Sequence, residues 1–387
     1  MAVYLDHAAT TPMLPEAIDA YTLALREVGN PSSIHSAGQN AKRVLEEARE
    51  RVAASLGCDP IEVVFTSGGT ESVNLAIKGL WWARQRDRPR PRLLVPGGEH
   101  HATVDTVEWL ATAEGAVVEW IPLDALGRIR LDALEESLRR SDDVALVTLL
   151  WANNEVGTLQ PVDEVVALAA AHGVPVHSDA VAAYRQVPVD FRSSGLAALS
   201  VSAHKIGGPI GIGALVLSRA ATVVPLLHGG GQQRQVRSGT QDAPAAVSFA
   251  VAASHPHPDL APLRDRVVRG VVAGVPGAVL RGDPRHRLPG NAHFTFPGCE
   301  GDSLLFLLDA AGVSVSTGSA CQAGIPEPSH VLLAMGVPEE EARGALRITV
   351  GHTTTEADVE AFLAVLPDAV ARATKAGYAD RTPLLGR

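Results

Sequence analysis

Short apolar runs alternate with longer amphipathic segments over the first two-thirds of the chain. The runs are rich in Val, Leu and Ala, as in VALVTLLWANN (144–154) and ALSVSAHK (198–205). Between them lie stretches with apolar residues near helical spacing, such as TESVNLAIKGLWWARQ (70–85) and PVDEVVALAAAHG (161–173). Continuous apolar strands that alternate with helices are typical of a mostly parallel sheet with helices on both faces. The pattern therefore predicts the α/β class.

The pattern changes in the last third, where SHPHPDLAPL (254–263) is rich in Pro and His and predicts a connecting segment. Strands and helices expected beyond it are the strands 278–282, 291–296 and 345–351 and the helices 301–312 and 356–377. These elements predict a smaller α+β lobe. The expected domains are a large one, 15–255, and a small one formed by 1–14 and 256–387, with a cysteine-bearing loop at about 316–330.

The composition is that of a globular protein, since 46% of the 387 residues are hydrophobic and 20% are charged. A formal net charge of −10 argues against non-specific binding to nucleic acid or to an anionic membrane. The three cysteines, Cys58, Cys299 and Cys321, form no CxxC pair, which suits a reducing compartment. The sequence shows neither a secretory signal pattern nor a membrane-spanning apolar run. We therefore expect a soluble, cytoplasmic protein.

One basic run stands out against this acidic balance. RQRDRPRPR places arginines at 84, 86, 88, 90 and 92. We interpret it as a solvated helix end and loop, with a surface for an acidic partner as the alternative. Either interpretation leaves these guanidinium groups in solvent.

Several common catalytic motifs are absent from the sequence. It contains no GxxxxGK[ST], HExxH, GxSxG or CxxC. GGPIGIG (207–213) does not read GxGxxG and precedes a strand, so it does not indicate a dinucleotide site. EHHATVD brings together Glu99, His100, His101 and Asp105, but adjacent histidines on one element point in different directions. We therefore expect no resident metal ion.

Lys205 lies at the end of the apolar run in LSVSAHKIGGPIG, where a buried charge is costly unless it is paired or neutralised. A neutral lysine is also a nucleophile toward carbonyl groups. Upstream, TSGGTES (66–72) is a turn before a helix, and its backbone amides and the Thr70 hydroxyl can hold a phosphate. Asp179, at the end of VPVHSD, can pair with a ring nitrogen cation. Together these features predict a site for pyridoxal 5′-phosphate (PLP).

Motifs along nearly the whole chain resemble those of one enzyme family. They are, in order, YLDHAATTP, GNPSSIH, FTSGGTESVNLAIKG, EHHA, WANNEVGT, SAHKIGGPIGIGAL, RSGT, STGSACQAG, EPSHVL and LRITVGHTT. The sequence resembles the cysteine desulfurases of the iron–sulfur-cluster and nitrogen-fixation type, in the class V aminotransferase family. The resemblance implies the fold-type I PLP scaffold and conversion of L-cysteine to L-alanine, with the sulfur captured as a persulfide.

The resemblance also implies a role for each matching residue. Lys205 would bind PLP covalently and remove the substrate α-proton, and His100 would stack on the cofactor ring and shuttle protons. Arg347, with Asn30 and Asn154, would bind the substrate L-cysteine through its carboxylate. The residues implied to contact the cofactor are Gly69, Thr70, Ser202 and His204 at the phosphate, Thr240 at the same phosphate from the other subunit, Asn154 at the ring hydroxyl and Asp179 at the ring nitrogen. The role of Thr240 implies a homodimer.

The sequence departs from the family pattern at one position. The family usually has a glutamine three residues after the aspartate, hydrogen-bonded to the phenolic oxygen of PLP, whereas this chain has Ala182. Gln186 comes four residues too late. The hydrogen bond is then lost, supplied by Ser202 or His204, or replaced by water.

Cys321 lies in STGSACQAGIPEP (316–328), among small and turn-forming residues typical of an exposed loop. The resemblance implies that its thiolate accepts the substrate sulfur and passes it to an acceptor or scaffold protein; the thiolate could also ligate an iron–sulfur cluster transiently. Cys58 and Cys299 are expected to be inert. Iron–sulfur cluster assembly, tRNA thiolation and DNA sulfur modification all draw on such enzymes, so the destination stays open. We expect no direct contact with nucleic acid.

Three alternatives fit parts of the sequence. A selenocysteine lyase or another PLP-dependent β-lyase would use the same fold, and a plain aminotransferase would need no mobile cysteine. A non-catalytic scaffold of this fold is the third, which Ala182 slightly favours. Product identity, dependence on Cys321 and cofactor absorbance distinguish them.

Overall fold

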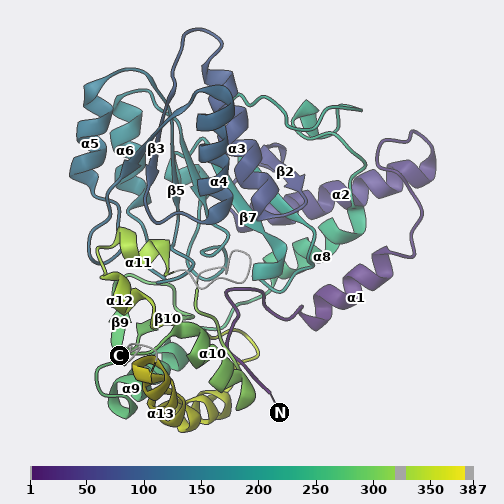
Figure 1. Ribbon diagram of the computed structural model, residues 1–387. Coiled ribbons are helices and arrows are strands. Elements are labelled where there is room, and N and C mark those ends of the chain that lie inside the picture. Colours follow the sequence, from purple (N-terminus) through teal and green to yellow (C-terminus); the bar gives the residue numbers. More distant parts are fainter. Residues whose placement is uncertain (1, 319–327, 380–387) are drawn as a thin grey trace, which may run out of the picture.

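The computed structural model describes residues 2–318 and 328–379. Cys321 therefore lies outside the described residues. The larger part of the molecule surrounds a central sheet, and a smaller lobe lies below it in Figure 1. The two short helices α11 (His330–Ala334) and α12 (Glu339–Ala342) lie between the two parts.

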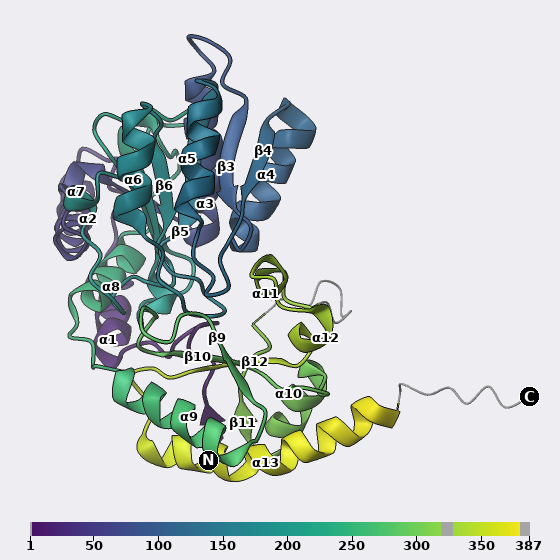
Figure 2. The same cartoon turned by 90° about the vertical axis from the view of Figure 1, so that its left-hand side faces the viewer.

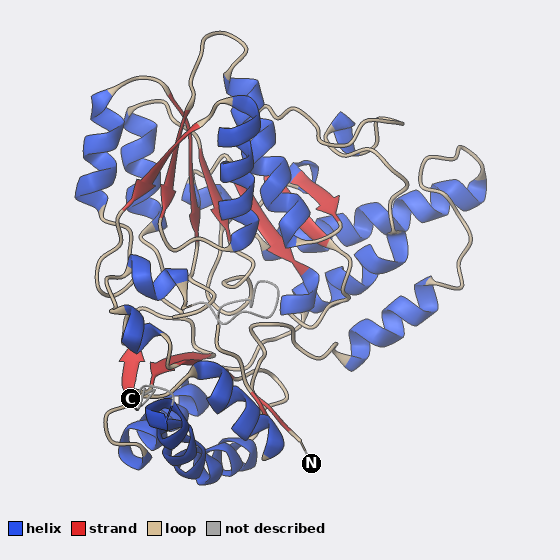
Figure 3. Ribbon diagram, in the orientation of Figure 1, coloured by secondary structure: helices blue, strands red, loops and turns tan. Residues whose placement is uncertain are grey.

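A seven-stranded sheet forms the centre of the larger part (Figure 3), with the strand order β2-β8-β7-β6-β5-β3-β4. Its strands are β2 (Val63–Thr66), β3 (Arg92–Pro96), β4 (Val117–Ile121), β5 (Val144–Leu150), β6 (Val176–Asp179), β7 (Ala198–Ser202) and β8 (Gly213–Leu217). Neighbouring strands from β4 to β7 pair in parallel, whereas β8 is antiparallel to both β7 and β2. The predicted α/β class with a mostly parallel sheet is confirmed.

Helices cover both faces of this sheet. The helices of the larger part are α1 (Pro15–Ala24), α2 (Ser36–Ser55), α3 (Gly69–Arg84), α4 (His101–Glu114), α5 (Leu131–Arg140), α6 (Val162–Ala171), α7 (Phe191–Ser194) and α8 (Ala243–Ser254). On one face, α3 and α4 share a core that includes Leu75, Leu93 and Val107. On the other, α2, α5, α6 and α8 share a core that includes Leu94 and Phe249. Successive residues such as Leu93 and Leu94 therefore enter different cores, which explains the continuous apolar runs.

The smaller lobe is built on a three-stranded antiparallel sheet in the order β12-β10-β9. Its elements are β9 (Val279–Arg281), β10 (Asn291–Thr295), β12 (Ala345–Thr349), α9 (Ala261–Gly274), α10 (Gly301–Ala310) and α13 (Glu356–Ala379), which surround a core of Phe294, Phe296 and Phe362. The N-terminal strand β1 (Val3–Tyr4) pairs in parallel with β11 (Val313–Ser314), so the first residues of the chain lie in this lobe (Figure 2). The domain bounds at residues 14 and 255 stay a prediction.

Cys58 and Cys299 are buried free thiols, one in each part of the molecule. Burial raises the pKa of Cys58 to about 12 and also raises the pKa of Cys299. Both thiols therefore stay protonated at neutral pH. Because the thiolate is the reactive form, this placement suits the inert role expected of them.

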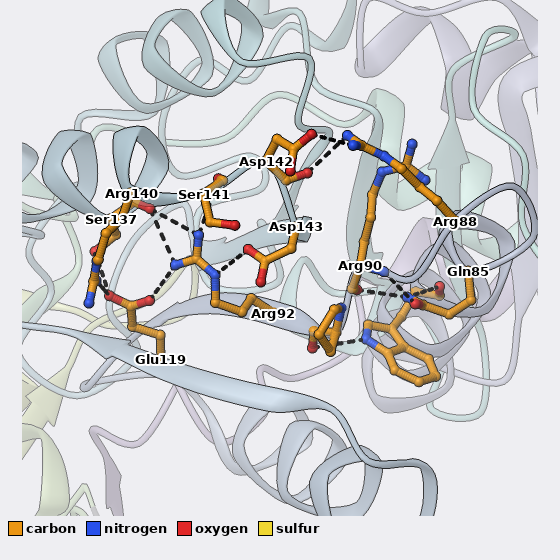
Figure 4. Close-up of polar contacts among 12 residues, drawn as sticks. Gln85, Arg88, Arg90, Arg92, Glu119, Ser137, Arg140, Ser141, Asp142 and Asp143 are labelled. Atoms are coloured by element: carbon orange, nitrogen blue, oxygen red, sulfur yellow. Dashed lines mark hydrogen bonds and ion pairs between the residues drawn. The ribbon is translucent and has the colours of Figure 1, made fainter.

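The arginine run is only in part the solvated helix end and loop that the sequence predicted, because Arg86 and Arg88 are exposed whereas Arg90 and Arg92 are not. Arg92 Nε lies 2.6 Å from Asp143 Oδ1, and Arg92 Nη1 lies 2.7 Å from Glu119 Oε2 (Figure 4). The side chains of Arg90 and Arg92 are both buried. Buried charges require partners. Arg90 pairs with Asp87 on the same loop at 2.6 Å, whereas the partners of Arg92 come from β4 and from the loop before β5. The interpretation as a solvated loop or as a surface for an acidic partner is therefore wrong for Arg90 and Arg92.

Candidate active site

A cavity of about 420 Å³ lies at the edge of the large sheet where the parallel strands end. The last residues of β5, β6 and β7, namely Leu150, Asp179 and Ser202, line it. Ligands of open α/β sheets bind at this edge. The residues predicted for the site that line the cavity are Gly69, Thr70, His100, Asn154, Asp179, Ser202, His204, Lys205 and Arg347.

Lys205 stands in a 3₁₀ turn, η2 (Ala203–Lys205), directly after β7. Its Nζ donates to the carbonyl oxygens of Ala8 and Ala9, the latter at 2.8 Å. Burial, together with the nearby Arg347 guanidinium, lowers the pKa of Lys205 to about 8. A substantial fraction of this amine is therefore uncharged near neutral pH, as a nucleophile or a base requires.

Asp179 ends β6, and its carboxyl group is buried beside the cavity. Oδ1 accepts a hydrogen bond from the Val181 N–H at 2.9 Å. Burial raises the pKa of Asp179 to about 6, although this hydrogen bond and the Lys205 cation oppose the rise. A cation bound in the cavity would stabilise the carboxylate, and a protonated ring nitrogen is such a cation.

Glu99 is a second buried carboxyl group, which sequence reasoning considered only as a metal ligand. Its Oε1 accepts a hydrogen bond from the Leu150 N–H at 2.9 Å, and Oε2 has no partner within the described part of the chain. Burial raises the pKa of Glu99 well above its ordinary value, and the Asp179 carboxylate adds to the rise. The two carboxyl groups are therefore close enough that the charge of one opposes ionisation of the other.

The start of α3 offers a site for an anion. A side chain at Gly69 would place its Cβ 2.7 Å from Val181 Cγ2, so any larger residue here requires the Val181 side chain to move. Ser202 Oγ is buried and has no hydrogen-bond partner among residues 2–318 and 328–379. Thr70 and His204 line the cavity nearby. Backbone N–H groups at a helix start and an unpartnered hydroxyl are donors that a phosphate group requires.

His100 is the N-cap of α4, and its Nδ1 accepts a hydrogen bond from the Ala102 N–H at 3.0 Å. Burial, followed by the Lys205 cation, lowers the pKa of His100 to about 4. The ring is therefore neutral, and because Nδ1 is the acceptor, Nε2 carries the proton. This orientation leaves Nε2 available as a donor, the property that a proton shuttle requires.

Arg347 lies on β12 and is held by two partners. Its Nη2 donates to Asp6 Oδ1 at 3.0 Å and its Nη1 to the Asn154 carbonyl oxygen at 3.0 Å. Nε is buried and has no partner within the described residues. The guanidinium is thus oriented at the cavity that it lines, and each Nη group carries a second N–H that can donate to a carboxylate. Asp6 is a site residue that sequence reasoning missed, and its signal was its place in the YLDHAATTP motif.

Two predicted site residues do not reach the cavity of this chain. Asn30 and Thr240 are exposed and do not line it within this chain. Cys321 lies outside the described residues. Ala182 does line the cavity, whereas Gln186 does not, because its amide Nε2 donates back to the Ala182 carbonyl oxygen at 3.2 Å. Gln186 therefore does not replace the usual glutamine.

Two other features of the described part of the chain concern metal ions and membranes. It holds no group of three or more His, Cys, Asp or Glu side chains arranged to bind a metal ion. None of its helices is both long and apolar enough to span a membrane.

Comparison with known proteins identifies the family. The Aminotransferase class-V model matches residues 3–362. The IscS-like cysteine desulfurase of Mycobacterium tuberculosis is 55% identical over 385 residues, which cover 97% of this chain and 98% of that protein. A solved NifS-like protein matches with a TM-score of 0.87 at 32% identity, covering 96% of this chain and 100% of that one. The structure described as SspA in complex with cysteine matches with a TM-score of 0.81 at 32% identity, covering 91% and 99%. The chain belongs to the class-V aminotransferase family.

The residues of the cavity fit PLP, the cofactor of this family. PLP presents a phosphate, a basic ring nitrogen and an aldehyde, which require an anion site, a carboxylate and an amine. The start of α3 with the unpartnered Ser202 Oγ, the buried Asp179 carboxyl group and the Lys205 amine supply these three around one cavity. The observation that points to a bound anion is the buried Ser202 hydroxyl, which has no partner among the described residues and lies near Gly69.

Proposed function

We propose that this protein is a PLP-dependent cysteine desulfurase, which converts L-cysteine to L-alanine and captures the sulfur as a persulfide on Cys321. The observation that carries the proposal is the convergence of Lys205, Asp179 and Arg347 on one cavity beside the start of α3. The 55% identity to an IscS-like cysteine desulfurase over nearly the full length supports the same reaction.

The chain's own residues would hold the cofactor at three points. Gly69, Thr70, Ser202 and His204 would bind the phosphate, and Asp179 would keep a proton on the ring nitrogen. When bound, PLP supplies the electron-withdrawing group that makes the substrate α-proton acidic.

The substrate would be oriented by Arg347 and deprotonated by Lys205. Arg347 would bind the α-carboxylate through the second N–H of its Nη groups, while Asp6 and the Asn154 carbonyl group fix the guanidinium plane. A Lys205 pKa of about 8 suits an amine that must accept and return a proton near neutral pH. His100 Nε2–H would supply protons within the same cavity.

Sulfur transfer would need a nucleophilic thiolate. The Cys321 thiolate would attack the sulfur of the substrate, so a sulfur–sulfur bond forms while the substrate carbon–sulfur bond breaks. The electron pair of the broken bond stays on the substrate carbon, which takes up a proton. The products are the Cys321 persulfide and L-alanine, and neither an oxidant nor a reductant is required.

We also propose a homodimer in the cytoplasm that hands sulfur to an acceptor or scaffold protein. Thr240 and Asn30, which do not reach the cavity of their own chain, would then contribute to the site of the partner subunit. In support, Val28 and Ile34 are 87% and 91% exposed, and Ile34 lines a hollow of about 710 Å³. Exposed apolar side chains at such a hollow favour an interface.

The test is alanine release from L-cysteine by the PLP-loaded protein, compared with Cys321→Ser. We expect alanine from the native chain and almost none from the variant, while both retain the cofactor absorbance. Equal alanine from both would assign the reaction to a β-lyase that does not use this thiol. Faster turnover of selenocysteine by both proteins would identify a selenocysteine lyase, and a protein that binds no PLP would be a scaffold.

A further inference from the structure

Both ends of the segment that carries Cys321 are attached to fixed elements of the fold. At its start, the Arg347 N–H donates to the Ser316 carbonyl oxygen at 2.6 Å, so Ser316 continues the ladder beside β12. At its end, Ser329 caps α11, and its Oγ accepts a hydrogen bond from the Leu332 N–H at 3.2 Å. Ser316 and Ser329 are therefore each held at a defined point of the fold.

The buried carboxylate of Glu155 binds the far end of this segment. Ser329 Oγ donates to Glu155 Oε2 at 2.5 Å, and both side chains are buried. The backbone of Glu155 is itself fixed, because its N–H donates to Asn153 Oδ1 and its carbonyl oxygen accepts from Asn291 Nδ2, each at 2.9 Å. Glu155 also follows directly after Asn154, the residue whose carbonyl oxygen orients Arg347. The carboxylate is thus a rigid point beside the substrate site.

The near end of the segment meets the same carboxylate and a buried histidine. Gly318, which lines the cavity, has a φ of +89°, a backbone conformation that favours glycine. A Cβ built on Gly318 would lie 3.4 Å from both Glu155 Oε2 and His293 Nε2. Gly318 therefore packs against both groups, and Glu155 contacts the two ends of the segment at once.

His293 has unused hydrogen-bonding groups at this point. It lies in β10 opposite Arg347, it is fully buried, and neither ring nitrogen has a partner among the described residues. Burial, followed by the Arg347 cation, lowers the pKa of His293 to about 3, so the ring is neutral. A buried polar group without a partner is costly, and in a native structure it indicates a functional demand.

We propose that Glu155 and His293 form an anchor under both ends of the segment and position Cys321 for attack on the substrate sulfur. The inference rests on the proposed function and deepens it, because it names positioning residues for the sulfur-transfer step. Cys321 follows Gly318 by three residues, so the position of Gly318 limits the region that the thiol can reach. Glu155 and His293 do not line the cavity, and they act through the segment.

The experiment compares Ser329→Ala and Glu155→Ala in the PLP-loaded protein. We expect single-turnover formation of alanine and of the Cys321 persulfide to fall by about tenfold to a hundredfold. The affinity for L-cysteine, measured as the concentration that gives half of the change in cofactor absorbance, should stay nearly constant. Substrate binding depends on Arg347, which both variants retain. Glu155→Gln, which retains an acceptor oxygen for Ser329, should lose less than Glu155→Ala.

Ser137→Ala is the matched control. Ser137 Oγ also donates to a glutamate, Glu119 Oε1, at 2.6 Å (Figure 4), but Ser137 does not line the cavity. This variant should leave both measurements unchanged. A native rate in Ser329→Ala, or an equal loss in Ser137→Ala, would overturn the anchor. Cys321→Ser, measured in parallel, distinguishes failure of the proposed function from failure of the anchor. If Cys321→Ser makes alanine at the native rate, the proposed function and the anchor both fail. If Cys321→Ser makes no alanine and Ser329→Ala makes it at the native rate, only the anchor fails.

Discussion

Replacing Asp179 by asparagine should stabilise the protein without PLP and damage the protein with PLP. The Asp179 carboxyl group is buried, and its pKa rises from the ordinary 3.8 to about 6 before any cation is bound. This rise corresponds to a cost of about 3 kcal/mol for holding the ionised carboxylate in the folded chain. Asparagine keeps the shape and the acceptor oxygen for the Val181 N–H but carries no charge.

The sign of the effect follows from the direction of the pKa change. Below pH 3.8 the carboxyl group is protonated in both the folded and the unfolded chain, and the substitution should change little. Between about pH 3.8 and 6 the unfolded chain ionises while the folded chain stays protonated, and above about pH 6 the folded chain ionises at the cost of burial. The gain in unfolding free energy from Asp179→Asn should therefore grow with pH and reach about 3 kcal/mol at neutral pH.

The assay is urea-induced unfolding of the PLP-free proteins between about pH 5 and 8, followed by circular dichroism. Asp105→Asn, at an aspartate whose side chain is 69% exposed, is the control and should stay within about 0.5 kcal/mol of the native chain. With PLP bound, Asp179→Asn should make alanine about a hundredfold more slowly, because the ring nitrogen loses its charged partner. An Asp179→Asn chain that is less stable at neutral pH, or a difference that does not vary with pH, would refute the reasoning.

Three other changes probe the rest of the account. The rate at which the PLP-free protein binds PLP, followed by absorbance, should rise with pH and level off above about 8, because the neutral Lys205 amine is the nucleophile. A rate that keeps rising toward the pKa of an ordinary lysine would contradict a Lys205 pKa of about 8. Gly69→Ala should weaken PLP binding by about tenfold to a hundredfold in a fluorescence titration, because the new Cβ would lie 2.7 Å from Val181 Cγ2. Gly274→Ala, whose Cβ would lie 3.8 Å from Pro367 Cγ, is the control and should leave PLP binding unchanged. Arg92→Ala should lower the free energy of unfolding by about 3 kcal/mol, while the folded enzyme keeps its rate of alanine formation. An unchanged free energy of unfolding would mean that water solvates Glu119 and Asp143 once the arginine is removed.

The fold and much of the cavity could be predicted because their signals are local. Apolar strands that alternate with amphipathic helices specify a doubly covered sheet, and the chemistry of such sheets lies where the strands end. Asp179, Ser202 and Lys205 each follow an apolar run directly, so the sequence alone placed them at that edge.

The features that sequence reasoning missed depend on partners distant along the chain. Asp6 pairs with Arg347 across 341 positions, and Glu155 pairs with Ser329 across 174 positions. The arginine run was misread for the same reason, since Arg92 finds Asp143 only through the pairing of β3 with β5. No periodicity in the sequence encodes such contacts.

The central claim is that sulfur leaves L-cysteine for Cys321, and it is tested most directly by mass spectrometry of the Cys321 peptide. The PLP-loaded protein would be mixed with one equivalent of L-cysteine without reductant, alkylated and digested, while alanine is counted in the same sample. The account predicts one added sulfur atom on Cys321 for each alanine released, and none on Cys58 or Cys299. Alanine formed in full while Cys321 remains unmodified would contradict it.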